Sequence, residues 1–284
     1  MNSYLIQCPG FIGDQFFASS VADALKEWKP DAIIDMLLPV VQPKYLLEAN
    51  PNIRHAFFGN ELSSYKNSHF ISLPTIDQSL AATLQFQRAA NIPEEYWQLS
   101  YRVWDCGNSQ FPLPPVFIKP VLGVVRSWPE KSFKFTREEY AQGIDTPNLG
   151  YGGKKHDIEY ILKELRKDFQ VILFGLDANV SQHSAEASNP RSFANMAWEI
   201  KYFCDFFLGP EGGLTNLAAG AGVRTAITTD FIWQLYGPNG IMRKIERPAM
   251  GPRTYFPNNN HLHIQPFADE DEIISTVRKW ALDV

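Results

Sequence analysis

The 284-residue sequence predicts an α/β fold made of two Rossmann-like, doubly wound domains that face each other across a cleft. Short apolar runs alternate with helical patterns along most of the chain, which is the order expected of right-handed βαβ units and parallel sheets. A proline-rich segment interrupts this alternation near the middle of the chain. The length also suits two domains of ordinary size better than one.

The first half of the chain contains four apolar runs that we expect to be strands. They cover residues 4–8, 32–38, 54–58 and 69–73. Between the first two, apolar residues from Phe17 to Trp28 recur at helical spacing, so an amphipathic helix should follow the first strand. We also expect a short helix over residues 43–49, ended by Asn50-Pro51, and a longer one over residues 76–90.

Residues 109–120 are the candidate linker between the domains, because they contain four prolines. Proline has no N–H to donate and stiffens the chain into an extended form. Beyond this linker we expect strands at 121–125, 170–174, 205–208 and 224–228, and helices at 157–167, 192–203 and 214–221. The predicted domains are therefore residues 1–115 and 116–267, followed by a final helical segment, 268–284.

This final segment has the pattern of an amphipathic helix over residues 269–282. Acidic residues open it and Arg278 and Lys279 close it, which complements the helix dipole at both ends. One face is apolar, so the helix must pack on a domain, and a return towards the N-terminal domain is one placement that we consider. Just before it, His261 and His263 alternate as in a solvated edge strand.

Composition excludes several classes of function. The net charge of −5 argues against a nucleic-acid partner, which usually requires a basic patch. No stretch approaches the roughly 18 consecutive apolar residues of a membrane helix, and the start lacks the features of a signal peptide, so we expect a cytoplasmic protein. Cys8, Cys106 and Cys204 are widely spaced and are expected to be reduced residues of the core.

Residues 206–228 carry the clearest functional signal of the chain. Their sequence predicts a buried strand, a turn at Gly212 and Gly213, a helix of small residues and a further strand. A helix that begins in this way presents unpaired N–H groups and a positive dipole end, which suit a phosphate. We expect donors from the backbone of Gly212, Gly213, Leu214 and Thr215, and from the Thr215 hydroxyl. The alternative is a plain tight turn before a helix packed in the core.

Four segments together resemble a known family. Ile12-Gly13-Asp14 follows the first strand, and Ile33-Ile34-Asp35 with Leu46-Leu47 and residues 50–53 forms a second unit. Residues 205–220 are similar to a signature that usually reads Asp-(Ser/Thr)-Gly-x-x-His-Leu-Ala-Ala, and residues 236–240 to a segment that follows it. In this order and spacing they resemble glycosyltransferase family 9, typified by the ADP-heptose:lipopolysaccharide heptosyltransferases, which have the two-domain GT-B fold.

The resemblance implies a metal-independent, inverting glycosyltransferase. The C-terminal domain would bind a nucleotide-diphosphate sugar, and the N-terminal domain a glycan or lipid-linked saccharide as acceptor, with peripheral membrane contact through that acceptor. Asp14 matches the position of the base that takes the acceptor's proton, and Gly13 lies beside it on the acceptor side. Without the family resemblance, the sequence predicts a structural role for Asp14, as an N-capping residue in a turn.

The resemblance also implies donor-binding residues in the second half. Lys131 lies where the family keeps a lysine against the donor phosphates, with Ser127 in the same loop, and Asp177 lies where it keeps an acid near the ribose. Without the family, Lys131 is a solvated loop lysine and Asp177 an ordinary turn residue. Glu211 and Asn216 stand in place of the usual aspartate and histidine of the signature, and an asparagine cannot carry positive charge. The sequence therefore leaves open whether the donor is ADP-heptose or another nucleotide sugar.

The alternatives are a non-catalytic nucleotide-sugar-binding protein and a sugar-nucleotide epimerase of the same architecture. A dinucleotide-dependent oxidoreductase is disfavoured, because residues 10–13 lack the full Gly-x-Gly-x-x-Gly spacing. We expect no metal and no cofactor. The acidic string at 269–272 matches the Asp-x-Asp motif with which another glycosyltransferase fold holds manganese, but its place at the start of a helix explains it.

Overall fold

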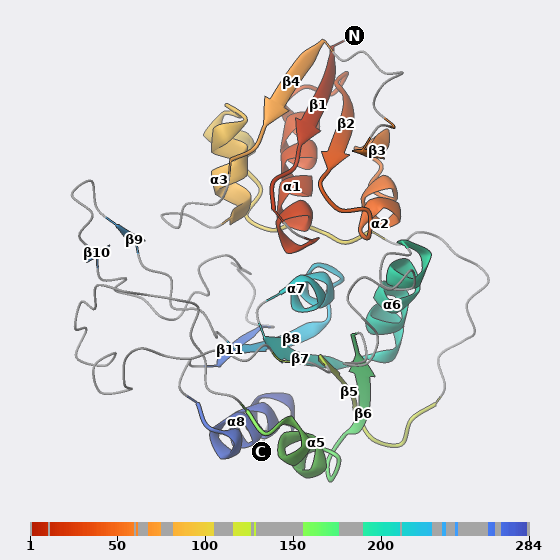
Figure 1. Ribbon diagram of the computed structural model, residues 1–284, viewed down its shortest axis with the longest axis vertical. Helices are drawn as coiled ribbons and strands as arrows, with labels where there is room; N and C mark the ends of the chain where they lie inside the picture. The colour runs from red at the N-terminus through yellow and green to blue at the C-terminus, as the bar shows by residue number, and fades with distance from the viewer. Residues whose placement is uncertain are drawn as a thin grey trace.

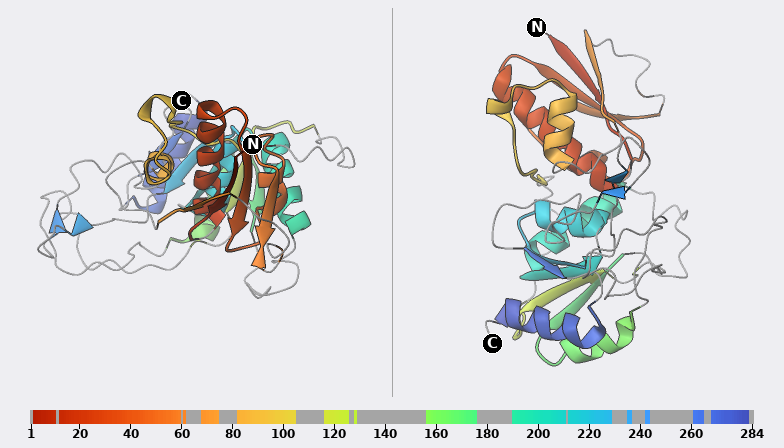
Figure 2. Two further views of the ribbon diagram at one scale, coloured as in Figure 1. Left: turned by 90° about the horizontal axis from the view of Figure 1, so that it is seen from above. Right: turned by 90° about the vertical axis from the view of Figure 1, so that its left-hand side faces the viewer.

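The computed structural model describes residues 2–10, 12–59, 61, 68–74, 82–104, 116–125, 128, 156–175, 190–210, 212–228, 235–236, 242–243, 261–264 and 268–282. Within these ranges the chain forms two parallel sheets with helices packed on them, one above the other along the long axis (Figure 1). The right-hand view of Figure 2 shows the same stacking from the side. The predicted α/β fold with two doubly wound domains is confirmed.

The N-terminal sheet has the order β3-β2-β1-β4 among the described residues, and its strands are parallel. Its elements are β1 (Ser3–Gln7), α1 (Ile12–Trp28), β2 (Ile33–Leu38), α2 (Lys44–Glu48), β3 (His55–Phe58), β4 (His69–Ser72), α3 (Ala82–Ala89) and the 3-10 turn η2 (Glu94–Tyr96). Helix α1 lies between α2 and α3 in Figure 1 and follows directly from the interior strand β1. The sheet thus places the first turn of α1 at the carboxyl ends of its strands.

The C-terminal sheet has the order β11-β8-β7-β5-β6 and is also parallel in the part that the structure describes. Its elements are β5 (Val121–Val125), α5 (Ile158–Leu165), β6 (Gln170–Phe174), α6 (Pro190–Phe203), β7 (Phe206–Pro210), α7 (Gly213–Gly220), β8 (Arg224–Thr228), β11 (Leu262–Ile264) and α8 (Glu270–Leu282); β9 (Leu235–Tyr236) and β10 (Met242–Arg243) form a short antiparallel pair. Every residue of β5 and β7 is buried, as expected for interior strands covered by helices on both faces.

The two faces of this sheet carry different helices. Helices α6 and α7 lie between the sheet and the N-terminal domain, and α5 and α8 cover the opposite face (Figure 1). Ile273, Ile274 and Val277 of α8 pack in the core of the C-terminal domain. The final helix therefore does not return towards the N-terminal domain, because its apolar face is buried against α5 and the far side of the sheet.

The acidic string at the start of α8 forms a reciprocal cap. The Asp269 main-chain N–H donates to Glu272 Oε2 at 3.0 Å, and the Glu272 N–H donates to Asp269 Oδ1 at 2.8 Å. These bonds satisfy two N–H groups that a helix start would otherwise leave unpaired. The side chains of Asp269 and Glu272 thus cap the start of the helix.

A similar structural role falls to Asp35, part of the Ile33-Ile34-Asp35 segment. It is buried in β2 and accepts two hydrogen bonds from the Arg54 guanidinium, one of them from Nε at 2.9 Å. A carboxylate enclosed in a sheet needs such a partner, because an unpaired buried charge is strongly destabilising. This pair fixes the segment between α2 and β3 to the centre of the N-terminal sheet.

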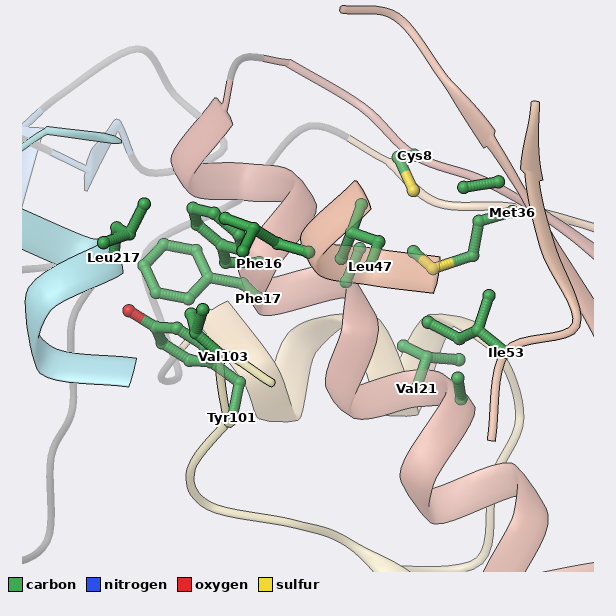
Figure 3. Close-up of a cluster of buried hydrophobic side chains, with 14 of the residues drawn as sticks. Cys8, Phe16, Phe17, Val21, Met36, Leu47, Ile53, Tyr101, Val103 and Leu217 are labelled. Atoms are coloured by element: carbon green, nitrogen blue, oxygen red, sulfur yellow. The ribbon is translucent and has the colours of Figure 1, made fainter. Parts of the chain in front are cut away.

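One hydrophobic cluster runs through both domains. It joins Phe16 and Phe17 of α1 to Leu217 of α7, and Tyr101 and Val103 of the connecting segment complete it (Figure 3). Helix α1 also contacts α7, and α2 contacts α6. The domains therefore share a core in addition to a linker. The domain boundaries that we predicted at residues 115 and 267 lie outside the described residues.

The two described cysteines are part of this interior. Cys8 and Cys204 are buried and form no disulfide. Burial raises the pKa of the Cys204 thiol to about 12 and raises that of Cys8 further. Both side chains are therefore thiols at neutral pH and behave as small apolar residues. Cys106 lies outside the described residues.

Candidate functional site at the contact of α1 and α7

The first turns of α1 and α7 meet where the two domains touch. A Cβ atom placed on Gly13 would lie 2.5 Å from Asn216 Nδ2, and one on Gly213 would lie 3.2 Å from the Ile12 Cβ. Glycine at these two positions thus lets the helix starts approach closely. Each helix follows a parallel strand, and ligands of open α/β sheets bind at the carboxyl ends of such strands. The contact is therefore the candidate site.

Asp14 lies in the first turn of α1, with 9% of its surface exposed. Its carboxylate is turned back over Gly10, where any Cβ atom would overlap Oδ2. Gly10 also has a φ of +64°, in the left-handed region that favours glycine. The loop after β1 is thus shaped to hold this carboxylate. The start of the helix dipole stabilises its negative charge.

The Thr215 hydroxyl closes the turn before α7. It accepts a hydrogen bond from the Gly212 N–H at 2.9 Å and donates one to the Pro210 carbonyl at 2.7 Å. The Thr215 side chain is fully buried. We had expected this hydroxyl and the Gly212 N–H to face a ligand, and the structure uses both inside the turn instead.

The next three N–H groups, those of Gly213, Leu214 and Thr215, precede the first hydrogen bond of the helix, in which the Asn216 N–H donates to the Gly212 carbonyl at 2.9 Å. Helix geometry gives such leading N–H groups no acceptor within the helix. Gly212 itself is extended, with a φ of 171°, and among the described residues a Cβ atom placed on it would meet only the Pro210 carbonyl oxygen, at 3.9 Å. The main-chain N–H groups of Gly213, Leu214 and Thr215 are therefore the backbone donors that this helix offers to an anion.

Replacing Thr215 by Val should lower the free energy of unfolding by about 2 kcal/mol, because a buried donor and a buried acceptor lose their partner. Thr215→Ser keeps the hydroxyl and should lose less. Urea unfolding of both variants measures the difference. Equal losses would show that the methyl group of Thr215, rather than its hydroxyl, supports the turn.

Two buried amide side chains lie in the same region. Asn216 is 3% exposed, and its Oδ1 has no hydrogen-bond partner in the part of the chain that the structure describes. Gln15, the residue after Asp14, is fully buried, and neither Oε1 nor Nε2 has a partner there. We did not predict a role for Gln15. The signal available was an amide within the apolar pattern of a helix, directly after the candidate base.

Tyr101 connects this site to the segment between the domains. Its hydroxyl donates to the main-chain carbonyl of Asn216, and its ring packs on Phe16 and Phe17. Burial raises the pKa of Tyr101 well above its usual value, so the hydroxyl remains protonated and can donate. Sequence patterns gave no sign of this contact, because its partners are 115 residues apart.

Of the predicted set, the structure thus brings Gly13 against Asn216, places Asp14 in the same first turn of α1, and brings Gly213 against that turn through Ile12. Ser127, Lys131, Asp177 and Glu211 lie outside the described residues. Across the described ranges, no three His, Cys, Asp or Glu side chains gather as metal ligands. No helix in these ranges is long and apolar enough to cross a membrane.

No known family model matches the sequence, and no curated protein sequence matches it. Solved structures do match over the full length. Escherichia coli ADP-heptose LPS heptosyltransferase II is 13% identical, with a TM-score of 0.60 over 100% of this chain and 99% of that one. A glycosyl transferase family 9 structure from Veillonella parvula is 10% identical, with a TM-score of 0.63 over 100% of this chain and 98% of that one.

A third match is E. coli heptosyltransferase WaaC with ADP-2-deoxy-2-fluoro heptose, 9% identical, with a TM-score of 0.57 over 99% of each chain. At such identities the similarity concerns the fold. The resemblance drawn from the four sequence segments is thereby confirmed at this level: the chain has the GT-B-like fold of the heptosyltransferases.

Proposed function

We propose that this protein is an inverting glycosyltransferase that moves a sugar from a nucleotide-diphosphate sugar to a saccharide or lipid-linked acceptor. The observation that carries the proposal is the contact between the first turns of α1 and α7. One brings a buried carboxylate, Asp14, and the other brings main-chain donors suited to a diphosphate. Inverting transfer needs a base at the acceptor hydroxyl and stabilised charge on the leaving group.

In this proposal Asp14 takes the proton from the acceptor hydroxyl as its oxygen attacks the anomeric carbon. The bond to the diphosphate oxygen breaks on the opposite side, and the N–H groups of Gly213 and Leu214 stabilise the charge that develops there. The mechanism invokes no metal and no cofactor. We place the reaction in the cytoplasm, and at the membrane surface where the acceptor is lipid-linked.

Four further residues belong to the proposed donor site by their place in the sequence. Ser127 and Lys131 follow β5, Asp177 follows β6, and Glu211 follows β7. These three strands are parallel neighbours, so the loops after them begin at one edge of the sheet. A lysine there would pair with phosphate oxygens, and Asp177 would accept hydrogen bonds from ribose hydroxyls.

The structural neighbours support a nucleotide sugar as the donor class. One is described with ADP-2-deoxy-2-fluoro heptose and another, also WaaC, with ADP. The neutral Asn216 favours one alternative, a protein that binds nucleotide sugars without transferring them. Release of nucleoside diphosphate only when an acceptor is present would distinguish a transferase from that binding protein and from an epimerase.

We expect one of the ADP-, GDP-, UDP- or dTDP-sugars to raise the melting temperature. A ligand at 100 times its Kd stabilises by about 2.7 kcal/mol, which corresponds to about 5–10 °C for a chain of this size. The measurement is the melting temperature of the protein with and without each of these nucleotide sugars. If none of the four nucleotides stabilised the protein, the proposed donor site would be wrong.

A matched pair of variants locates the binding site. Gly213→Pro removes one N–H at the first helical position, where proline is tolerated, and the extended Gly212 before it suits a following proline. Gly213→Ala adds the same crowding against Ile12 but keeps the N–H. We expect the proline variant to lose most of the thermal shift and the alanine variant to keep it. Equal shifts would place the diphosphate elsewhere.

A further inference from the structure

The buried amide of Gln15 is the largest unexplained polar group in the described part of α1. Its side chain is fully buried, yet Oε1 and Nε2 both lack a hydrogen-bond partner there. A buried polar group without a partner costs about 1–3 kcal/mol, and such groups are rare in native proteins. Other buried amides in the described part of the chain do have partners. The Gln87 amide, for example, bonds to Ser20 Oγ and to two carbonyl oxygens.

Gln15 lies in the first turn of α1, on the edge of the helix that it shares with Ile12. Residues three or four apart share a helix face, and Gln15 is three residues from Ile12, which packs on Gly213 of α7. The adjacent Phe16 stacks on Phe193 of α6 at 6.4 Å. Gln15 thus lies in the first turns of α1, beside Asp14 and near the contact with the donor-binding helix.

Asn216 brings a second unpaired amide atom to this contact. Its Nδ2 lies against Gly13, while its Oδ1 has no partner among the described residues. This is an independent observation, because Asn216 belongs to α7 and the other domain. The first turns of α1 and α7 therefore carry three polar atoms without a partner among the described residues, all on neutral side chains.

The chemistry of these atoms selects the ligand. An amide oxygen needs a donor, and an ionised diphosphate has no donor to give. An amide nitrogen needs an acceptor, so a purely cationic group would not serve either. A hydroxyl group both donates and accepts, and a sugar ring presents several. The unpaired atoms thus match the uncharged, hydroxylated part of a nucleotide sugar.

We propose that Gln15 and Asn216 bind hydroxyl groups of the transferred sugar, which makes Gln15 a residue that determines sugar specificity. The inference rests on the proposed glycosyltransferase function and adds a residue of this chain to its donor site. In this arrangement the diphosphate lies at the Gly213 and Leu214 N–H groups, and the sugar extends from it towards Asp14.

Gln15→Met tests the proposal, because methionine has nearly the same shape and no amide. We expect the ligand-free variant to melt at a higher temperature, since the unpaired polar atoms are removed. We expect its affinity for the nucleotide sugar to fall about tenfold, which corresponds to one lost hydrogen bond. Its affinity for the nucleoside diphosphate alone should not change. Calorimetric titration with both ligands measures the difference.

Gln87→Met is the matched control, because Gln87 is equally buried and its amide is fully used inside the protein. This variant should melt at a lower temperature and bind both ligands as the wild type does. Asn216→Leu provides a second test in the other domain and should also weaken binding of the nucleotide sugar alone.

The outcomes separate this inference from the function on which it rests. If the wild type bound a nucleotide sugar and Gln15→Met and Asn216→Leu bound it equally well, the sugar-binding role would be wrong and the transferase proposal would stand. If the variants lost affinity for the nucleoside diphosphate as well, the hydroxyls would be those of the ribose, which also overturns the inference. A wild type that binds no nucleotide sugar overturns both.

Discussion

Asp14→Asn should lower the rate of sugar transfer by about 100- to 10,000-fold, the usual contribution of a general base. The carboxamide keeps the size of the carboxylate and its place over Gly10, but it cannot accept a proton from the acceptor. Donor binding relies on the N–H groups of α7 in our proposal, so the thermal shift with the nucleotide sugar should persist. Steady-state release of nucleoside diphosphate in the presence of acceptor measures the rate.

Asp23→Asn is the control for this experiment, because Asp23 lies on the same helix and bonds to the side chains of Asn50 and Asn52. That change should reduce stability slightly and leave the rate as it is. A rate for Asp14→Asn close to that of the wild type would remove Asp14 from the mechanism. The helix start would then serve only to position α1 against α7.

The fold could be predicted from the sequence because its signals are local. Apolar runs and helical spacing gave the main strands of both sheets, and β1, β5 and β6 differ from prediction by one residue or less at either end. The short elements were harder to predict from the sequence. The β9–β10 pair and the turn η2 were not predicted, since two or three residues carry no periodic pattern. The alternation of His261 and His263 did indicate β11, the edge strand of the C-terminal sheet.

The direction in which an amphipathic helix packs was not predictable in the same way. The apolar face of α8 was clear, but a pattern along one helix does not specify which domain covers it. Contacts with α5 decide that question, and they join segments about 110 residues apart in the sequence.

The candidate site, too, was predicted only where its signals are local in the sequence. Gly213 was predicted because a glycine turn before a helix has a local sequence signature, whereas Gly13 and Asp14 were predicted through the family resemblance. The Thr215 hydroxyl was assigned to a ligand although the turn itself needed it, since local side-chain bonds compete with ligand binding for the same atom. Gln15 and Tyr101 were missed because burial and partners across the domain contact give them their importance.

Tyr101→Ala should cause the largest loss of stability among the changes considered, about 4 kcal/mol in the free energy of unfolding. The ring is 6% exposed, stacks on Phe16 at 6.4 Å and meets Phe17 edge-on at 5.1 Å. It also lies so close to α7 that a Cβ atom on Gly220 would be 2.5 Å from its Cε2. Removing it leaves a cavity between the domains. Urea unfolding measures the loss.

Tyr101→Phe separates the hydroxyl from the ring. It keeps the packing and removes the hydrogen bond to the Asn216 carbonyl, so we expect a loss of about 1–2 kcal/mol. Tyr45→Ala is the control on an exposed tyrosine of α2 and should stay within about 0.5 kcal/mol of the wild type. A loss for Tyr101→Ala no larger than that for Tyr45→Ala would show that the two domains do not depend on this contact.

The same variants connect stability to function. Tyr101 bonds to the residue whose side chain reaches Gly13, so its hydroxyl helps to fix the start of α7 against the start of α1. If that placement matters for transfer, Tyr101→Phe should lower kcat more than it weakens binding of the nucleoside diphosphate, because the distance between base and donor sugar would be less well defined. An unchanged kcat in this variant would mean that packing around Phe16 and Phe17 is enough to position the two helices.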